Sequence, residues 1–521
     1  MRSALFTVVL ASTALAAPPR AAVTAFLPPS SSNPALQQLA LLLEARASEL
    51  VEETGKASEL HLKQVVRAIT EEGFSADFGD PANADALRMA VGADRAVAFS
   101  LEAKDDALVL SGVTVDGKKP KPFSEKLPKT WAGALDKGSL ALAKAMLAGA
   151  PLAKRTAAQP VSTSDEALQQ LGQCYPVVIR QSLSPETPAL LDATELERAS
   201  AACTKAVELD PKLRFAHAVN ALAQAILGGD AAAARSLAAL GDADDMLEVY
   251  SLARFWLLTR YQSNEAGVAF LSDVIKKRPG ELIARAYLGD TQFALSAWAD
   301  AEQTWRGYLE RAPASPWAWA RLSKALARQG KHDEAIAAAR KSFALSPTSP
   351  ETRLELASRL IDAGNAAEAK TLLEPLARAA SPRGEHLLRL GWAHWVLGEL
   401  DPAQAYFQRA VDVATAPGEW RTRGRAHYDL ALVAVKQGRR DAAKAALKAS
   451  LASGLKLREL DPSLAETARE LERGEVNKAT GSAKPALVPK EASLFPVDDY
   501  GEPDVKAKKP PAPAGLVLYR F

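Results

Sequence analysis

Aromatic and ionisable side chains gather in a few helical stretches of this sequence, where ligand binding or metal chemistry would have to be built. Trp392 and Trp395 lie among small residues in LRLGWAHWVLGELDPAQAYFQRA, a pattern that fits either an aromatic ligand box or core packing. His386 and His394 are about 12 Å apart along a helix, which is too far for joint metal ligation. The sequence contains no GxxxxGKS/T phosphate loop, no HExxH, no GxSxG and no EF-hand loop. We therefore predict a non-enzymatic protein without cofactor or metal.

Length and charge limit the class of partner. The chain has 521 residues, with 64 basic and 62 acidic side chains and a formal net charge of +2. Such a length predicts two or more domains or an elongated array. A weak overall field does not favour nucleic acid or an anionic membrane as the main partner. We predict that other proteins are the partners, and the oligomeric state is left open.

The first residues have the pattern of an export signal. Arg2 precedes an apolar run, and Ala14-Leu15-Ala16 supplies a cleavage site of the A-x-A type. The run is shorter than the ~20 apolar residues that cross a bilayer, and no later segment of the sequence approaches that length. We predict a signal peptide over residues 1–16 and an exported, periplasmic protein, with an extracellular location as the alternative.

Two cysteines, Cys174 and Cys203, both fall within helical patterns. An oxidising compartment would allow one disulfide, but buried free cysteines are common, so we expect free thiols. The sequence leaves the pairing open.

The remaining chain is organised by a sequence repeat with a period of about 34 residues. Pro279, Pro313 and Pro347 are separated by this period, and each closes a similar phrase. A leucine followed by a small residue recurs, then a glycine, then an alanine at a constant separation from the leucine. The leucines are Leu288, Leu322, Leu356, Leu390 and Leu430, the glycines Gly330, Gly364, Gly398 and Gly438, and the alanines Ala301, Ala335, Ala369, Ala403 and Ala443. Small residues on two helices permit close antiparallel crossing, and glycine and proline mark the turns.

This pattern resembles the tetratricopeptide repeat. The resemblance implies a mainly α fold, a right-handed superhelical solenoid over residues 166–474, with clear units over 282–457 and a capping helix at its carboxyl-terminal end. Large residues such as Trp305 and Phe407 are expected to fill the space between units. Residues 151–165 are predicted to be a linker. Residues 475–521 are rich in Pro and Lys and are predicted to be disordered, although GLVLYRF at their end could instead add to a sheet edge.

Residues 21–150 follow a different pattern. AAVTAFLPP predicts a strand, NPALQQLALLLEARASELVEETG a long helix, and RAVAFSLEAKDDALVLSGVTVDGK a hairpin. The order resembles the TolB-type amino-terminal α/β domain. That resemblance implies a small sheet flanked by helices and an interaction role, with no catalytic residues.

In tetratricopeptide repeats the first helices line the concave side, and this resemblance selects the candidate binding residues. They are Tyr287, Asp290, Trp317, Arg321, Lys324, Arg328, Arg389, Trp392, Trp395 and Tyr428. Glu351, Glu355 and Asp362 fall at similar positions. Three basic residues on one helix are expected to form a binding site for an acidic peptide or helix. We predict an adaptor of the bacterial cell envelope. The alternatives are a glycan-binding module that stacks sugars on Trp392 and Trp395, and an enzyme with its active site in the amino-terminal domain.

Overall fold

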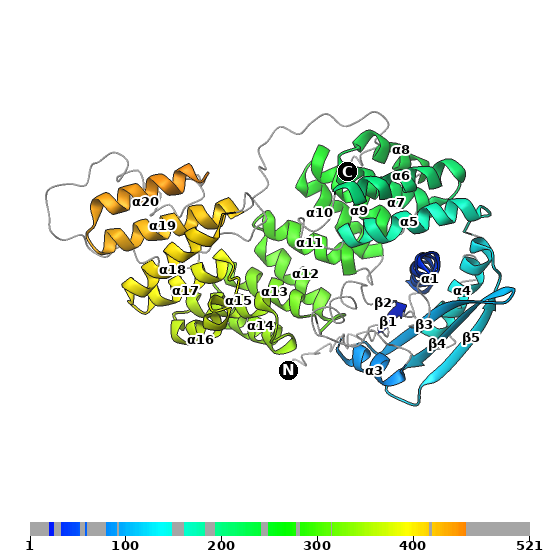
Figure 1. The fold of residues 1–521 in the computed structure, drawn as a ribbon, viewed down its shortest axis with the longest axis horizontal. Helices are drawn as coiled ribbons and strands as arrows, with labels where there is room; N and C mark the ends of the chain where they lie inside the picture. The colour runs from blue at the N-terminus through cyan, green and yellow to red at the C-terminus, as the bar shows by residue number, and fades with distance from the viewer. Residues whose placement is uncertain are drawn as a thin grey trace, which may run out of the picture. The chain divides into compact units, whose positions relative to one another are not determined.

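The structure of this chain is a computed structural model, which describes many separate stretches of the sequence. These are residues 20–25, 33–52, 58–59, 80–90, 93–147, 161–182, 193–240, 248–277, 282–313, 315–415 and 419–454. The predicted signal peptide, the capping helix after residue 457 and the predicted disordered tail lie outside the described residues. The elements, labelled in Figure 1, fall into two compact units, with the boundary inside helix α9 (Glu248–Tyr261).

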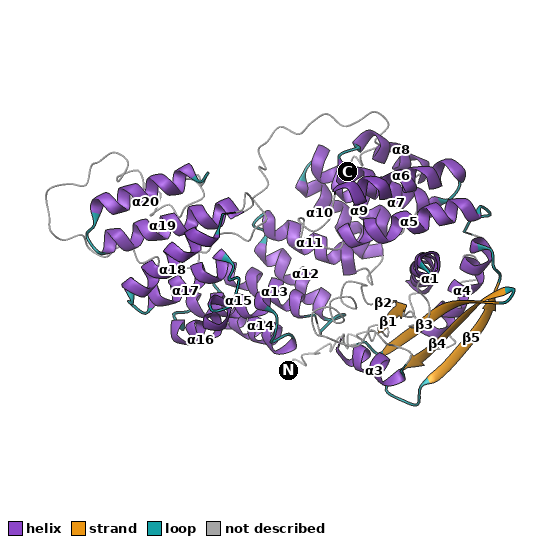
Figure 2. Ribbon diagram, viewed as in Figure 1, coloured by secondary structure: helices purple, strands orange, loops and turns teal. Residues whose placement is uncertain are grey.

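The first unit begins with a small mixed sheet. Its strands are β1 (Arg20–Ala25), β2 (Ser58–Glu59), β3 (Arg95–Lys104), β4 (Ala107–Val115) and β5 (Lys121–Leu127), in the order β2-β1-β3-β4-β5. Strand β1 pairs in parallel with β2 and β3, whereas β3, β4 and β5 are antiparallel (Figure 2). Helices α1 (Pro34–Glu52) and α4 (Trp131–Met146) pack on each other and on the sheet, and α3 (Pro81–Ala90) contacts β3 and β4. The structure thus contains the predicted first strand, long helix and hairpin.

Helical hairpins follow the sheet in the first unit. They are formed by α5 (Asp165–Ser182) with α6 (Ala193–Leu209) and by α7 (Arg214–Leu227) with α8 (Asp230–Leu240). The Asp165 carboxylate accepts hydrogen bonds of 3.0 Å from the backbone N–H groups of Trp131 and Ala132. Because these groups begin α4 and have no partner within that helix, Asp165 caps α4 while it opens α5. The amino-terminal sheet layer and the first hairpin are therefore joined by specific hydrogen bonds.

The two cysteines form a disulfide, and the expectation of free thiols is wrong. Cys174 lies in α5 and Cys203 in α6, with their Cα atoms 5.4 Å apart. Both residues do lie inside helices, as the sequence indicates. Antiparallel packing of these two helices brings the residues face to face, which their separation of 29 residues does not reveal.

The second unit contains most of the repeats. Helix α9 (Glu248–Tyr261) precedes α10 (Asn264–Lys277), and five hairpins follow. They are α11 (Leu282–Ala294) with α12 (Trp298–Leu309), α13 (Pro316–Arg328) with α14 (His332–Leu345), α15 (Pro350–Asp362) with α16 (Ala366–Ala377), α17 (Gly384–Val396) with α18 (Leu400–Val413), and α19 (Trp420–Lys436) with α20 (Arg440–Ala452). These are the five clear units that the sequence predicts.

The repeated residues perform the predicted structural roles. Each predicted turn glycine has a positive φ, between 72° and 81°, a conformation that glycine adopts without steric cost. The first hairpin has Ser296 at this position, with φ 60°. The five repeated alanines of the second helices are all buried.

Residue sizes at the helix crossings are complementary. A Cβ atom on Gly289 would lie 2.6 Å from the Trp305 indole, and one on Gly391 would lie 2.5 Å from the Phe407 ring. In both hairpins the large ring follows the glycine at the same separation along the sequence. The other three hairpins hold a buried serine or alanine at the first position and a buried alanine or leucine at the second. Glycine in the first helix therefore makes room for an aromatic ring in the second.

Candidate functional site

The candidate site lies along the first helices of the five hairpins, α11, α13, α15, α17 and α19. Within this row α13 contacts α15, α15 contacts α17, and α17 contacts α19. Four charged residues occupy the same repeat position, directly before the repeated leucine, and their sign alternates along the row. This charge column consists of Arg321, Glu355, Arg389 and Asp429. All four are buried, with relative exposures of 7%, 6%, 7% and 0%.

The first member of the column connects α13 to α11. The Arg321 Nε atom lies 3.2 Å from an Asp290 carboxylate oxygen, and its guanidinium lies 5.4 Å from the Trp317 ring centroid. Arg328, two turns further along α13, lies 5.9 Å from the ring centroid of Phe293. Together with Lys324, these arginines form one face of α13 at spacings of three and four residues. We call Arg321, Lys324 and Arg328 the basic stripe.

The second member connects α13 to α15. The Ser323 hydroxyl donates a hydrogen bond of 2.9 Å to Glu355, and the Arg359 Nε atom lies 3.2 Å from the same carboxylate. Arg359 also pairs with Asp362 at 3.3 Å. Burial raises the pKa of the Asp362 carboxyl, while Arg359 and Arg389 act in the opposite direction. Arg389 of α17 is thus close enough to act electrostatically on α15.

The last member connects α17 to α19. The Trp392 indole N–H donates a hydrogen bond of 2.9 Å to the Asp429 carboxylate, and the Arg425 Nε atom lies 3.5 Å from its other oxygen. Burial raises the pKa of Asp429 to about 7, against the lowering effects of Arg425, Trp392 and Arg389. Burial likewise lowers the pKa of Arg425, against the raising effect of Asp429. Asp429 is thus fully buried, and its carboxylate contacts both Trp392 of α17 and Arg425 of its own helix.

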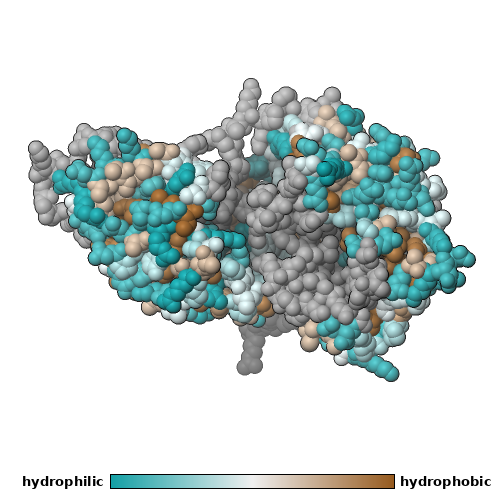
Figure 3. Space-filling view, viewed as in Figure 1, coloured by the Kyte–Doolittle hydropathy of each residue, from teal (hydrophilic) through white to brown (hydrophobic). Residues whose placement is uncertain are grey.

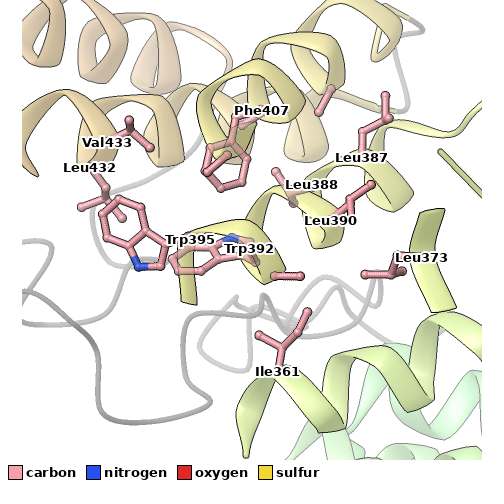
Figure 4. Packing of buried hydrophobic residues seen from close by; sticks show 14 of the residues in the cluster. Ile361, Leu373, Leu387, Leu388, Leu390, Trp392, Trp395, Phe407, Leu432 and Val433 are labelled. Carbon is pink, nitrogen blue, oxygen red and sulfur yellow. The ribbon is translucent and has the colours of Figure 1, made fainter. Parts of the chain in front are cut away.

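Three of the predicted aromatic contact residues belong to the hydrophobic core. Trp392, Trp395 and Tyr428 are 3%, 5% and 2% exposed. Trp392 packs against Trp395 and Phe407 with ring centroids 5.9 Å and 6.0 Å apart (Figure 4). The question raised by the LRLGWAHWVLGEL stretch is thereby answered in favour of packing. Whether these residues also bind a partner stays a prediction.

The remaining candidates keep part of their surface. Tyr287, Asp290, Trp317, Lys324 and Arg328 are all half-buried. Tyr287 packs near Phe255 and Trp256 of α9, with centroid distances of 5.5 Å and 6.5 Å. The structure therefore brings the candidates of α11 and α13 together as one half-buried patch.

Sequence reasoning did not select Arg425 and Asp429. A signal for Asp429 was present, because the residue before each repeated leucine reads Tyr, Arg, Glu, Arg, Asp along the five units. Arg425 lies four residues earlier on the same helix, which is the spacing of a helical ion pair. Across the part of the chain that the structure describes, no group of three or more His, Cys, Asp or Glu side chains could hold a metal ion. None of the described helices is long and apolar enough for a membrane span.

The raised pKa of Asp429 predicts a pH dependence of stability. The unfolded carboxyl ionises near pH 3.8 and the folded one near 7, so between these values the folded state binds the additional proton. The contribution of Asp429 to the free energy of unfolding is fully present below pH 3.8. It decreases as the pH rises above this value, and it is lost once the pH has risen through 7. Asp429→Asn removes this dependence, because the amide does not titrate. We expect the free energy of unfolding of wild type relative to Asp429→Asn to fall by roughly 2 to 3 kcal/mol between pH 5 and pH 8. Urea unfolding at several pH values measures it.

Asp412→Asn is the matched control for this measurement. Asp412 is an exposed carboxylate on α18 of the same hairpin stack. Its replacement should leave the pH profile parallel to that of wild type. Parallel profiles for wild type and Asp429→Asn would contradict the prediction.

The fold and this face define a protein with stacked helical hairpins, and sequence comparison matches part of this stack, residues 288–416, to a family of repeats. Three profiles of the tetratricopeptide repeat family match residues 288–350, 326–387 and 387–416. The chain therefore contains tetratricopeptide repeats over this region, as the regular spacing of the prolines predicts. No curated protein matches the sequence.

Solved structures of tetratricopeptide repeat proteins are similar to parts of the chain. One, a tetratricopeptide repeat protein from Parabacteroides merdae, is 11% identical, with a TM-score of 0.37 over 58% of this chain and 99% of that one. PilW, described as a type IV pilus biogenesis factor, is 19% identical, with a TM-score of 0.33 over 39% of this chain and 92% of its own. MamA from Desulfovibrio magneticus is 18% identical, with a TM-score of 0.27 over 37% and 97% of the two chains.

Proposed function

We propose that this protein is a non-enzymatic interaction scaffold of the bacterial cell envelope, which binds segments of partner proteins along the first helices α11 to α19. The charge column carries this proposal. Buried charges destabilise a fold unless they are paired, and a hydrophobic residue at the same position would pack without that penalty. Four charged residues of alternating sign at one repeat position therefore indicate a requirement other than packing.

The composition of the patch on α11 and α13 supports a protein partner. Tyrosine, tryptophan and arginine supply most of the binding energy at protein interfaces, and Tyr287, Trp317 and Arg328 lie there half-buried. On the face drawn in Figure 3 the described surface is mostly hydrophilic, with hydrophobic residues in small scattered groups. Recognition by paired charges and a few rings suits the composition of the patch on α11 and α13.

The envelope location has two supports. The first residues have the pattern of a signal peptide, and α5 and α6 are joined by the Cys174–Cys203 disulfide. Disulfides form and persist in oxidising compartments such as the bacterial periplasm. The resemblance of residues 21–150 to the TolB-type domain fits the same location. Glycan stacking on Trp392 and Trp395 has no support, because their ring faces are buried.

Charge reversal on the basic stripe tests the proposed binding face. We expect the full chain with Lys324→Glu and Arg328→Glu to capture partner proteins from envelope extract at least about tenfold less than wild type, because a ten-fold loss needs only about 1.4 kcal/mol of binding energy. Quantitative mass spectrometry of the captured proteins measures it. Both residues are half-buried, so the folded state of the variant is checked by circular dichroism.

Lys444→Glu with Lys448→Glu is the matched control. These lysines have the same four-residue spacing and the same charge change, but they are exposed on α20, a second helix. The control should capture the partners of wild type. Equal loss in both variants, or no loss in either, would rule out the first-helix face as the binding site.

A further inference from the structure

One end of the amino-terminal sheet presents an exposed turn that is rich in lysine. The turn joins β4 to β5 and reads DGKKPK from Asp116 to Lys121, with Gly117 at φ 76°. The Asp116 carboxylate fixes this turn, because it accepts a hydrogen bond of 3.3 Å from the Lys118 backbone N–H and pairs with the Lys121 side chain at 3.5 Å. Lys118, Lys119 and Lys121 are all exposed, and we call them the lysine turn.

The carboxyl-terminal end of α3 lies beside the lysine turn (Figure 2). A Cβ atom on Gly117 would lie 3.5 Å from a guanidinium nitrogen of Arg88. Arg88 is held in place by Asp85, whose carboxylate lies 2.7 Å from its Nε atom. The next residue, Met89, is 62% exposed, the highest value among the exposed large hydrophobic side chains that the structure describes. Exposed positive charge and an exposed apolar side chain therefore occur together at this end of the sheet.

Positive charge exceeds negative charge around the lysine turn. Strand β3 begins at the same end of the sheet, since Ala96 pairs with Val115. The described charged residues at this end are Arg88, Arg95, Lys118, Lys119 and Lys121, against Asp85, Asp94 and Asp116. Although Asp116 also attracts Lys118 electrostatically, neither Lys118 nor Lys119 forms an ion pair with any residue that the structure describes. The small net charge of the whole chain thus conceals a local positive surface.

The adjoining edge of β5 is poorly suited to pairing with a further strand. Pro122 has no backbone N–H, and the Lys126 carbonyl already accepts a hydrogen bond of 2.6 Å from the Lys137 ammonium group. Proline and exposed lysines on an edge strand oppose such pairing. What this end of the sheet offers to a partner is therefore side-chain charge rather than main-chain hydrogen bonds.

We propose that the lysine turn and Met89 bind the surface of a membrane that contains anionic phospholipids. Clustered lysines are attracted to anionic headgroups, and an apolar side chain beside them enters the boundary between headgroups and acyl chains. Lysine is depleted at protein interfaces, which favours a lipid surface over an acidic protein. With few charges and one apolar side chain, the contact is reversible and peripheral. The inference goes beyond the proposed function, because it adds a second surface that does not use the first helices α11 to α19.

Sedimentation with lipid vesicles tests the proposal on the chain from residue 17 onward, the form expected once the predicted signal peptide has been removed. We expect binding to vesicles of equal parts phosphatidylglycerol and phosphatidylcholine, and none to vesicles of phosphatidylcholine alone. Lys118→Glu with Lys119→Glu should lower the partition coefficient at least about tenfold, because two cations become anions at the same surface. Met89→Ser should lower it about fivefold, since the apolar contribution is lost. Added salt should weaken the binding of wild type, because it screens exposed charges.

Lys444→Glu with Lys448→Glu is the matched control, with the same charge change on exposed lysines of α20. This variant should bind the mixed vesicles as wild type does. Equal binding to both kinds of vesicle, or equal loss in the two double variants, overturns the proposal. Unchanged binding of Met89→Ser overturns the apolar part of the contact. If the vesicles fail to bind while polyglutamate binds through Lys118 and Lys119, the turn recognises acidic protein and this inference falls. Vesicle binding and partner capture depend on different residues, so either one can fail while the other stands.

Discussion

Trp305→Ala is expected to lower the free energy of unfolding of the second compact unit by about 3 to 5 kcal/mol, the usual range for removing a buried tryptophan. Trp305 is fully buried and fills the space opposite Gly289, where a Cβ atom would lie 2.6 Å from its ring. Its ring centroid lies 4.9 Å from that of Trp317 at an interplanar angle of 90°. Alanine leaves a cavity at the crossing of α11 and α12 and removes the edge-to-face contact with α13.

Urea unfolding followed by far-ultraviolet circular dichroism measures this loss, and Trp319→Ala is its control. Trp319 lies on α13, is half-buried, and its indole N–H donates a hydrogen bond of 2.8 Å to the Pro313 carbonyl. Its removal leaves no closed cavity, so a smaller loss is expected. Because neighbouring repeats unfold together, the effect should extend to α13 and α14 in hydrogen exchange. A loss for Trp305→Ala no larger than that for Trp319→Ala would contradict the size complementarity inferred at this crossing.

The repeat region was predictable because its sequence rules are local. A glycine that must adopt positive φ, such as Gly364, and an alanine at a close crossing, such as Ala369, are each dictated by the geometry of one hairpin. The constant repeat period then copies these requirements along the chain. Helices α11 to α20 therefore follow from counting residues.

How deeply each side chain is buried within the stack of helices was less predictable from the sequence. Repeat position indicates which way a residue points, but not how much surface the next helix covers. Trp395 occupies a position that the family directs toward the groove, yet it packs beside Trp392, Leu432 and Val433 (Figure 4). Arg389 and Asp429 are covered in the same manner. The charge column is visible in the sequence, but its burial depends on how the neighbouring helices pack.

In the first unit, some features depend on pairing between separate segments of the chain, so the local sequence pattern did not predict them. Strand β5 was not predicted, because KPFSEKL is short, mostly exposed and contains Pro122. It forms by antiparallel pairing with β4, from Leu108↔Leu127 to Thr114↔Lys121. The disulfide was missed for a related reason. The stretch 183–192, which lies outside the described residues, separates α5 from α6, so the local pattern does not reveal that the two cysteines face each other.

Reduction of the Cys174–Cys203 disulfide is expected to lower the free energy of unfolding of the first unit by roughly 3 to 4 kcal/mol, the loop-entropy value for a separation near 30 residues. The crosslink joins α5 to α6, and α5 contacts α1 and α4 beside the sheet. Loss of the crosslink therefore weakens the connection between the sheet layer and the hairpins. Urea unfolding with and without dithiothreitol measures the change.

Cys174→Ala with Cys203→Ala provides the control, because its unfolding curve should not respond to dithiothreitol. Helices α13 to α20 should keep their hydrogen-exchange protection in either chain, since the crosslink is confined to the first unit. The same bond tests the envelope location proposed above. If the chain is exported as proposed, thiol trapping should find the bond formed in the full-length chain and absent from a chain that lacks residues 2–16 and would stay in the reducing cytoplasm. Free thiols in the full-length chain would contradict both the crosslink and the oxidising location, because buried cysteines 5.4 Å apart between their Cα atoms are placed to pair wherever an oxidant is present.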